Sequence, residues 1–239
     1  MGGSKEMSDK EHVLIGKLRQ QLADKVMDRR EFVRYAALLG MAVPTAYAMA
    51  GKIVGEDFAP AARAEDMPKG GILKIAQRIP KLDSPHVFSW VYDSNVVRQV
   101  NGYLTRTGAD NVTRPHLASK WEASEDLKTW TFTISDAKWH NGQPFTAEDA
   151  AWNIKHCLDP KVGSSVVGLM KGYMLKDVDT GTKDDKGAAV MTTELWDANA
   201  VMVKDAKTLV LNLKEAQVAV PEHFFHYPFL MINPAENGK

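Results

Sequence analysis

The residues best suited to metal chemistry stand in the segment Pro221–His226. His223 and His226 are three positions apart, so a helix would place them on one face, with Glu222 beside them. A metal site normally takes three or four ligands with supporting hydrogen bonds, and no further ligand is evident in the sequence. The residue order is also not that of the zinc hydrolases. We therefore expect these imidazoles to pack among neighbouring aromatic rings and to bind no metal.

The single cysteine and one acidic loop could carry other chemistry. Cys157 falls on the apolar face of a predicted helix, which favours a small buried side chain over a reactive thiol. The segment Thr180–Gly187 lacks the acidic spacing and closing glutamate of a calcium loop, so we expect a solvated surface loop. The sequence has no nucleophile elbow, phosphate loop or dinucleotide fingerprint. No catalytic residue and no cofactor is expected.

The 239 residues suffice for one or two domains, and the net charge of zero argues against nucleic acid as a main partner.

The segment 114–160 predicts a hairpin followed by a capped helix. Apolar and polar residues alternate along Thr129–Ile134, which we expect to pair with Lys120–Ala123 across a polar turn. Asn141-Gly142 favours a tight turn with positive φ. Thr146 can cap a helix whose third residue, Asp149, reaches back to the cap.

Elements on either side are predicted from shorter patterns. Gly71–Ala76 indicates a strand, and Asp93 or Ser94 could cap a helix that continues toward Leu104. Residues 160–200 are less regular, apart from a short helix at Val167–Leu175. A second hairpin is expected between 201–203 and 208–213, where leucines alternate.

The N-terminal region has the order of an export signal. Asp28–Arg34 resembles the twin-arginine export motif through Arg29, Arg30 and Phe32. The weakly apolar run at 35–50 is too short for a stable membrane span. The alternative is an ordinary N-terminal helix with a solvated arginine pair.

Cleavage of this segment is expected after Ala64, where polar sequence begins. The first 27 residues are polar and contain apolar positions that could form a short amphipathic helix. We do not expect that helix to belong to the mature fold.

The segment 114–160 also carries a family resemblance. Its matching residues occur in order: Pro115, Leu117-Ala118, Trp121-Glu122-Ala123-Ser124, Trp130-Thr131-Phe132, Trp139-His140-Asn141-Gly142 and Thr146-Ala147-Glu148-Asp149-Ala150. This pattern resembles that of the family-5 extracellular solute-binding proteins, the peptide-, oligopeptide- and nickel-binding receptors of bacterial ABC importers. Leu127 departs from it, because a turn glycine is usual there.

The resemblance implies an α/β fold with mixed sheets, like that of periplasmic binding proteins. Residues 1–64 would be leader and signal, 65–104 the start of lobe I, 105–230 the small inserted domain II, and 231–239 a return into lobe I. Lobe III would be absent. By position, Ser89, Trp90, Val91 and Tyr92 match the family loop that touches bound ligand. Trp90 and Tyr92 have suitable chemistry for that role, since each combines a broad apolar face with one polar group. The alternative is that both are packing residues.

The implied function is capture of peptides or similar solutes in the periplasm for an ABC permease and its ATPase. We expect a monomer with no enzymatic activity, exported by the twin-arginine machinery that the N-terminal motif indicates. Without lobe III, we expect ligand binding to be weak. Two alternatives remain: a secreted enzyme that contains a cofactor, and an exported interaction module.

Overall fold

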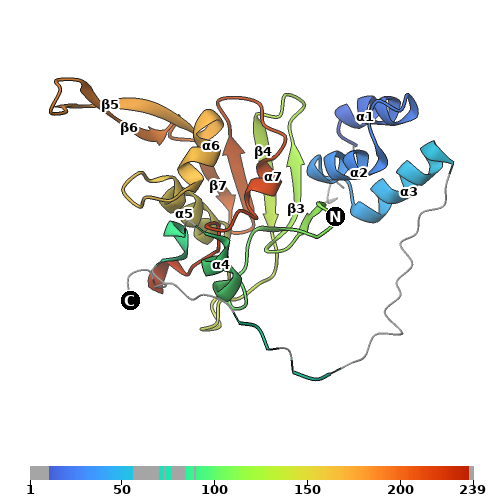
Figure 1. Cartoon of the computed structure of the whole chain (residues 1–239), viewed down its shortest axis with the longest axis horizontal. Helices are drawn as coiled ribbons and strands as arrows, with labels where there is room; N and C mark the ends of the chain where they lie inside the picture. The colour runs from blue at the N-terminus through green and yellow to red at the C-terminus, as the bar shows by residue number, and fades with distance from the viewer. Residues whose placement is uncertain (1–10, 56–69, 73, 77–83, 89, 237–239) are drawn as a thin grey trace, which may run out of the picture.

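The computed structural model describes residues 11–55, 70–72, 74–76, 84–88 and 90–236. Within these ranges the chain combines antiparallel sheets with helices, which confirms the predicted mixture of α and β structure. Figure 1 shows a central sheet flanked by helices, with three N-terminal helices packed beside it and a long hairpin projecting from the other end.

The central sheet has four strands in the order β3-β4-β8-β7, and it is antiparallel throughout. Its strands are β3 (Ala118–Ala123), β4 (Thr129–Ile134), β7 (Val201–Asp205) and β8 (Thr208–Asn212). Both predicted hairpins are therefore confirmed, and they join through the pairing of β4 with β8.

One face of this sheet forms the core. Trp130 and Phe132 of β4 are fully buried, as are Leu209 and Leu211 of β8, so the period-2 alternation separates the two faces as predicted. Helix α5 (Ala147–Leu158) packs against β7 and β8, and α6 (Val166–Met174) packs against α5.

The start of α5 matches its sequence signals. The backbone N–H of Thr146 donates to the Asp149 carboxylate, and the Asp149 N–H donates to the Thr146 hydroxyl. Gly142 has a φ of +86° in the turn before the helix, which explains why glycine is favoured there.

Leu127 also has positive φ, at +57°, in the turn between β3 and β4. This is where the family resemblance predicts a glycine. The leucine side chain packs against both the main core and the N-terminal helices. Its contacts therefore offset the cost of a conformation that L-residues disfavour.

Short elements connect these parts. They are η1 (Pro85–Val87), α4 (Val91–Val97), β1 (Thr105–Thr107), β2 (Thr113–Pro115), α7 (Val220–His223) and η2 (Pro234–Glu236). Strands β1 and β2 pair as a two-stranded ribbon.

Two predictions before residue 105 are wrong. The described residues of Gly71–Ala76 form no strand, and Ile72 and Ile75 are largely exposed. A strand needs a neighbour to pair its backbone groups, and no described segment pairs there. Helix α4 has Trp90 as its N-cap instead of Asp93 or Ser94, and it ends at Val97.

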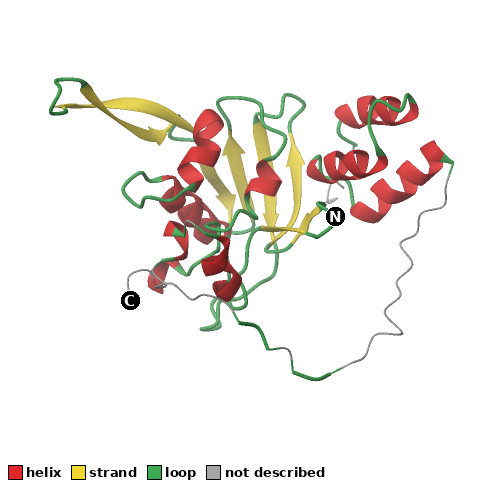
Figure 2. Cartoon of the chain, viewed as in Figure 1, coloured by secondary structure: helices red, strands yellow, loops and turns green. Residues whose placement is uncertain are grey.

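The surface loop predicted at Thr180–Gly187 is exposed throughout, as expected, but 180–183 belong to a strand and only 184–187 lie in the turn of a long hairpin. This consists of β5 (Leu175–Lys183) and β6 (Ala189–Leu195), joined by a turn at 184–188. Figure 2 shows the hairpin extending from the body. It was missed because its side chains are mostly exposed on both faces, so no apolar alternation marks it.

Three helices make up the described N-terminal part: α1 (Leu14–Ala23), α2 (Arg29–Leu38) and α3 (Val43–Val54). The predicted amphipathic helix is thus present as α1, and Asp28 caps α2 in a capping box with Glu31. Across the described ranges, we find no helix with the length and apolar character needed to cross a bilayer.

Candidate functional site

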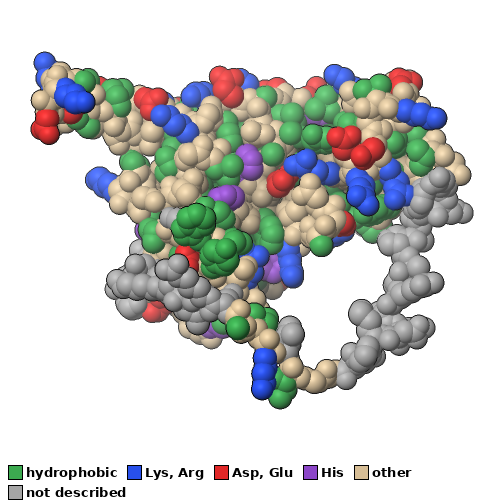
Figure 3. Space-filling model, viewed as in Figure 1, with side chains coloured by type: hydrophobic (Ala, Val, Ile, Leu, Met, Phe, Trp, Pro, Cys, Tyr) green, Lys and Arg blue, Asp and Glu red, His purple; other side chains and the backbone are tan. Residues whose placement is uncertain are grey.

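The predicted ligand-contacting residues begin at the entrance to α4. Ser89 lies outside the described residues. Trp90, Val91 and Tyr92 are 68%, 46% and 54% exposed, so the first turn presents apolar surface to solvent. Figure 3 shows hydrophobic side chains gathered over this part of the molecule.

The other side of α4 is anchored in the protein. Ser94 is buried, and its hydroxyl donates to the Val91 carbonyl oxygen. Arg98 donates to the Ser94 hydroxyl at 2.8 Å and stacks over the rings of Tyr103 and Phe225. The exposed aromatic turn therefore stands on a fixed base, as a binding surface requires.

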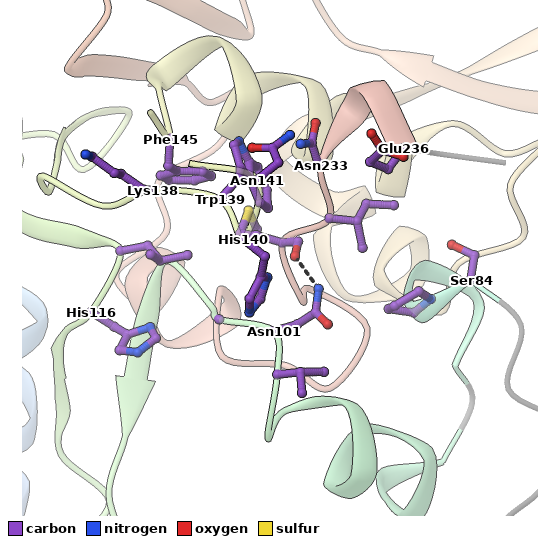
Figure 4. Close-up of a pocket in the computed structure, with 16 residues that line it drawn as sticks. Ser84, Asn101, His116, Lys138, Trp139, His140, Asn141, Phe145, Asn233 and Glu236 are labelled. Atoms are coloured by element: carbon purple, nitrogen blue, oxygen red, sulfur yellow. Dashed lines mark hydrogen bonds between the residues drawn. The ribbon is translucent and has the colours of Figure 1, made fainter. Parts of the chain in front are cut away.

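A separate cavity of about 990 Å³ lies between the segments that flank α4 and the loop before α5. Figure 4 shows residues from several distant segments around it. Its lining residues are Ser84, Pro85, Val100, Asn101, Gly102, His116, Leu117, Lys138, Trp139, His140, Asn141, Phe145, Met231, Ile232, Asn233 and Glu236. Trp90, Val91 and Tyr92 do not line this cavity.

Backbone and amide contacts hold the cavity walls together. The Asn101 side chain donates to the Met231 carbonyl oxygen at 2.8 Å, as Figure 4 shows, and the Met231 N–H donates to the Gly102 carbonyl oxygen. Asn153 both donates to the Ile232 carbonyl oxygen and accepts from its N–H, each at 2.9 Å. The segment after residue 230 is therefore fixed against both α5 and the loop after α4.

A close approach shapes one corner of the cavity. A Cβ on Gly102 would lie 3.0 Å from both the His116 ring and the Leu117 side chain, so a residue without a side chain is favoured here. The Nδ1 atom of His116 lies 2.9 Å from the Tyr103 carbonyl oxygen, which requires a proton on Nδ1.

The loop from Lys138 to Phe145 forms the opposite wall. The Trp139 indole donates to Asp149 at 3.1 Å, and its ring meets Phe145 edge-on at 5.2 Å. Asn141 and His140 add polar groups to this wall. Amide and imidazole groups over an apolar floor can hold a polar organic solute by hydrogen bonds and apolar contact.

A pair of histidines joins η1 to α5 next to this cavity. His86 Nε2 lies 3.0 Å from the Leu230 carbonyl oxygen, and His86 Nδ1 lies 2.8 Å from His156 Nδ1. Only an N–H group can hydrogen-bond to a carbonyl oxygen, so His86 carries its proton on Nε2. Its unprotonated Nδ1 therefore accepts a hydrogen bond from the Nδ1–H of His156. Burial lowers the pKa of His86 to about 4 and also lowers the pKa of His156, so both rings are neutral near pH 7.

Sequence reasoning missed this pair because its members are 70 positions apart. Neither histidine belongs to a motif. The signal that comes closest is the position of His86 between Pro85 and an apolar residue, and it says nothing about a partner on α5.

The other chemically notable residues have structural roles. His223 Nδ1 lies 2.6 Å from the Tyr173 hydroxyl, and the His226 ring packs on Tyr227. No group of three or more metal-ligating side chains occurs in the part of the chain that the structure describes. Cys157 is fully buried, as predicted, and burial raises the pKa of its thiol.

Comparison with known proteins places this geometry in a family. The model of the bacterial extracellular solute-binding proteins, family 5 Middle, matches residues 112–239. This range includes the central sheet, α5, α6 and the projecting hairpin.

Individual relatives agree with this match. The dipeptide-binding protein DppE of Bacillus subtilis is 39% identical over 120 residues, which cover 48% of this chain and 19% of that protein. The periplasmic oligopeptide-binding protein OppA of Haemophilus influenzae is 35% identical over 133 residues, covering 51% of this chain and 25% of that protein. The chain thus spans a quarter or less of these relatives.

A solved structure supports the fold. The Escherichia coli murein tripeptide binding protein MppA superposes with a TM-score of 0.50 at 23% identity, covering 65% of this chain and 30% of that one. The family model covers more than half of the 239 residues, so the chain belongs to the bacterial extracellular solute-binding proteins of family 5.

Proposed function

We propose that this chain is part of the substrate-binding component of an ABC importer, which captures peptides or similar solutes in the periplasm. The family consists of solute-binding proteins, and relatives carry the names of dipeptide- and oligopeptide-binding proteins. Its partners would be the solute, an inner-membrane permease and the ATPase that powers it. In this role the protein carries no catalytic residue.

The exposed first turn of α4 carries this proposal. Trp90 and Tyr92 are both more than half exposed, while Ser94 on the same short helix is fully buried. Large aromatic side chains that stay exposed on an anchored helix suit contact with a ligand. In our proposal, Ser89, Trp90, Val91 and Tyr92 form one wall of the ligand cleft.

The proposed domain layout is the one that the family resemblance implies. Residues 65–104 would begin lobe I, 105–230 would form domain II, and 231–239 would return into lobe I. Hinge closure of a further lobe over the α4 turn would enclose the solute. In this proposal the α4 turn supplies only part of the contacts to the solute, so binding to this wall alone is expected to be weak.

Export is the second part of the proposal. Arg29, Arg30 and Phe32 would form the motif read by the twin-arginine machinery, with cleavage after Ala64, which lies outside the described residues. The mature protein would act as a monomer in the periplasm.

The binding role can be tested with tripeptides and the 239-residue chain by saturation-transfer NMR, which detects weak ligands. We expect a dissociation constant weaker than about 1 μM, or about −8 kcal/mol. Trp90→Ala should weaken binding at least about tenfold, which corresponds to about 1.4 kcal/mol. Met191→Ala is the matched control, because Met191 is an exposed apolar residue on the projecting hairpin, 53% accessible. Equal affinities for Trp90→Ala and the parent chain would contradict the proposed wall.

A further inference from the structure

The three N-terminal helices are docked on the family domain and share a core with it. Their buried residues include Ile15, Leu22, Phe32, Val33, Ala36, Ala37, Leu39, Ala46 and Ala50. Val112 of the domain is buried in the same cluster, and Leu127 and Val218 pack against it. The helices therefore cover apolar surface that belongs to the domain.

Directional contacts fix the docked position. The indole N–H of Trp121 on β3 donates to the Leu38 carbonyl oxygen at the end of α2, at 2.9 Å in a buried position. Arg34 on α2 donates to both oxygens of Glu222 on α7, at 2.7 and 3.0 Å. A single guanidinium nitrogen of Arg34, Nη2, makes both contacts, and charge-assisted hydrogen bonds of this kind are stronger than neutral ones.

The backbone fits closely at the same place. Gly40, with a φ of +92°, follows α2, and a Cβ there would lie 2.7 Å from the Trp121 carbonyl oxygen. Such a distance is too short for any other residue without a shift of the backbone. At the far end of the interface, the His12 ring donates to the Ser124 carbonyl oxygen at 3.1 Å, since its Nδ1 accepts from Leu14 N–H.

The proposed export motif is only partly accessible in the docked helices. Phe32, its aromatic member, is fully buried, whereas Arg30, two positions earlier, is exposed. The apolar run at 35–50 is divided between α2 and α3, and four of its six alanines are buried in the shared core. An export machinery that must bind Phe32 and this apolar run cannot reach them while the helices stay docked.

We propose that α1–α3 is an intramolecular latch: it occupies the domain surface around Val112, Trp121 and Glu222, and it withholds the export motif until it opens. The export role of the latch rests on the proposed function. The occupant of this surface is the chain's own N-terminal segment, and opening exposes Phe32 and Val112 together.

Thiol labelling measures the opening directly. Val112→Cys places a thiol of similar size under the latch, while native Cys157, fully buried in the main core, reports global unfolding in the same molecule. We expect Val112→Cys to react at least tenfold faster than Cys157. Adding Glu222→Gln should speed the Val112→Cys reaction about tenfold further and leave Cys157 unchanged.

A matched control removes an ion pair elsewhere. Glu194→Gln breaks the exposed pair with Lys176 on the projecting hairpin and should not change either labelling rate. Gly40→Ala is a second way to open the latch, through the close contact with Trp121. Labelling of Val112→Cys no faster than Cys157 in every variant would overturn the latch, because the helices would then open only with the whole fold.

Export is measured separately, in a bacterium that has the twin-arginine machinery. Glu222→Gln should raise the rate at which the chain reaches the periplasm; faster labelling without faster export would overturn the latch as a restraint on export. Arg29→Lys with Arg30→Lys should abolish export if the proposed function is right. If this variant is exported normally, the export proposal fails, while the labelling rates still decide whether the helices open independently.

Discussion

The buried His86–His156 pair predicts that the fold loses stability between pH 6.5 and pH 4. Burial lowers the pKa of His86 from 6.5 to about 4, because the folded protein surrounds the ring with little water. The folded protein therefore favours the neutral form of the His86 ring. Its contribution to stability is fully present above pH 6.5 and disappears as the pH falls toward 4.

The magnitude follows from the shift. A change of one pKa unit corresponds to 1.36 kcal/mol, so a shift from 6.5 to about 4 corresponds to about 3 kcal/mol. Protonation would also replace an acceptor on His86 Nδ1 with a donor that faces the donor of His156, 2.8 Å away. The pair would then have two N–H groups pointed at each other.

Urea unfolding at pH 7 and pH 4.5, followed by tryptophan fluorescence, measures this loss. The stacking of Trp152 on His156, with ring centroids 4.6 Å apart, places a reporter next to the pair. His86→Gln removes the titrating group while keeping a polar side chain. The parent chain should lose about 2–3 kcal/mol more than His86→Gln between these two pH values. Equal losses would refute the reasoning, since carboxylates titrate alike in both proteins.

Three further predictions concern packing. Trp130→Ala should lower the free energy of unfolding by about 3–5 kcal/mol in urea titrations, because the fully buried indole fills the centre of the sheet; a loss below about 1 kcal/mol would contradict its place in the core. Gly102→Ala should cost about 1–3 kcal/mol in the same assay, because its Cβ would lie 3.0 Å from His116 and Leu117; an unchanged midpoint would mean that this corner can relax. The Cys157 thiol should react with a disulfide reagent at pH 7 only on unfolding, because it is fully buried and its pKa is raised; fast reaction of the native chain would contradict this.

Local sequence signals predicted local structure well. The alternation in Thr129–Ile134 and the Thr146–Asp149 capping pair each involve residues a few positions apart, so the structure confirms them. The strand expected at Gly71–Ala76 failed because a strand depends on a partner that a local pattern cannot supply. The sequence does not predict the β5–β6 hairpin, because its side chains are mostly exposed on both faces and so show no alternation of apolar and polar residues.

The candidate site was only partly accessible to such reasoning. Trp90 and Tyr92 are two positions apart in the chain, and the family resemblance singles them out, with side-chain types that suit binding. The cavity is assembled from segments between Ser84 and Glu236, and its walls depend on contacts such as Asn153 with Ile232, 79 positions apart. No short motif encodes a contact of that range.

The docking of α1–α3 was also beyond the sequence patterns. The sequence indicates an export motif at Asp28–Arg34, and apolar spacing in the first 27 residues predicts the amphipathic helix that the structure shows as α1. That α2 would end under Trp121 and pair with Glu222 depends on residues far away in the chain. The leucine at position 127 is the closest local hint, because it stands where the family usually has a turn glycine and its side chain packs against these helices.

The indole N–H signals of the six tryptophans give the most direct test of the proposed ligand wall. Trp121, Trp130, Trp139 and Trp196 each donate an indole hydrogen bond within the protein, whereas the Trp90 side chain is 68% exposed. A two-dimensional NMR titration with a tripeptide should shift the Trp90 signal and leave the other indole signals in place. A shift of Trp139 with Trp90 unchanged would place the ligand in the cavity instead and contradict the α4 turn as the binding wall.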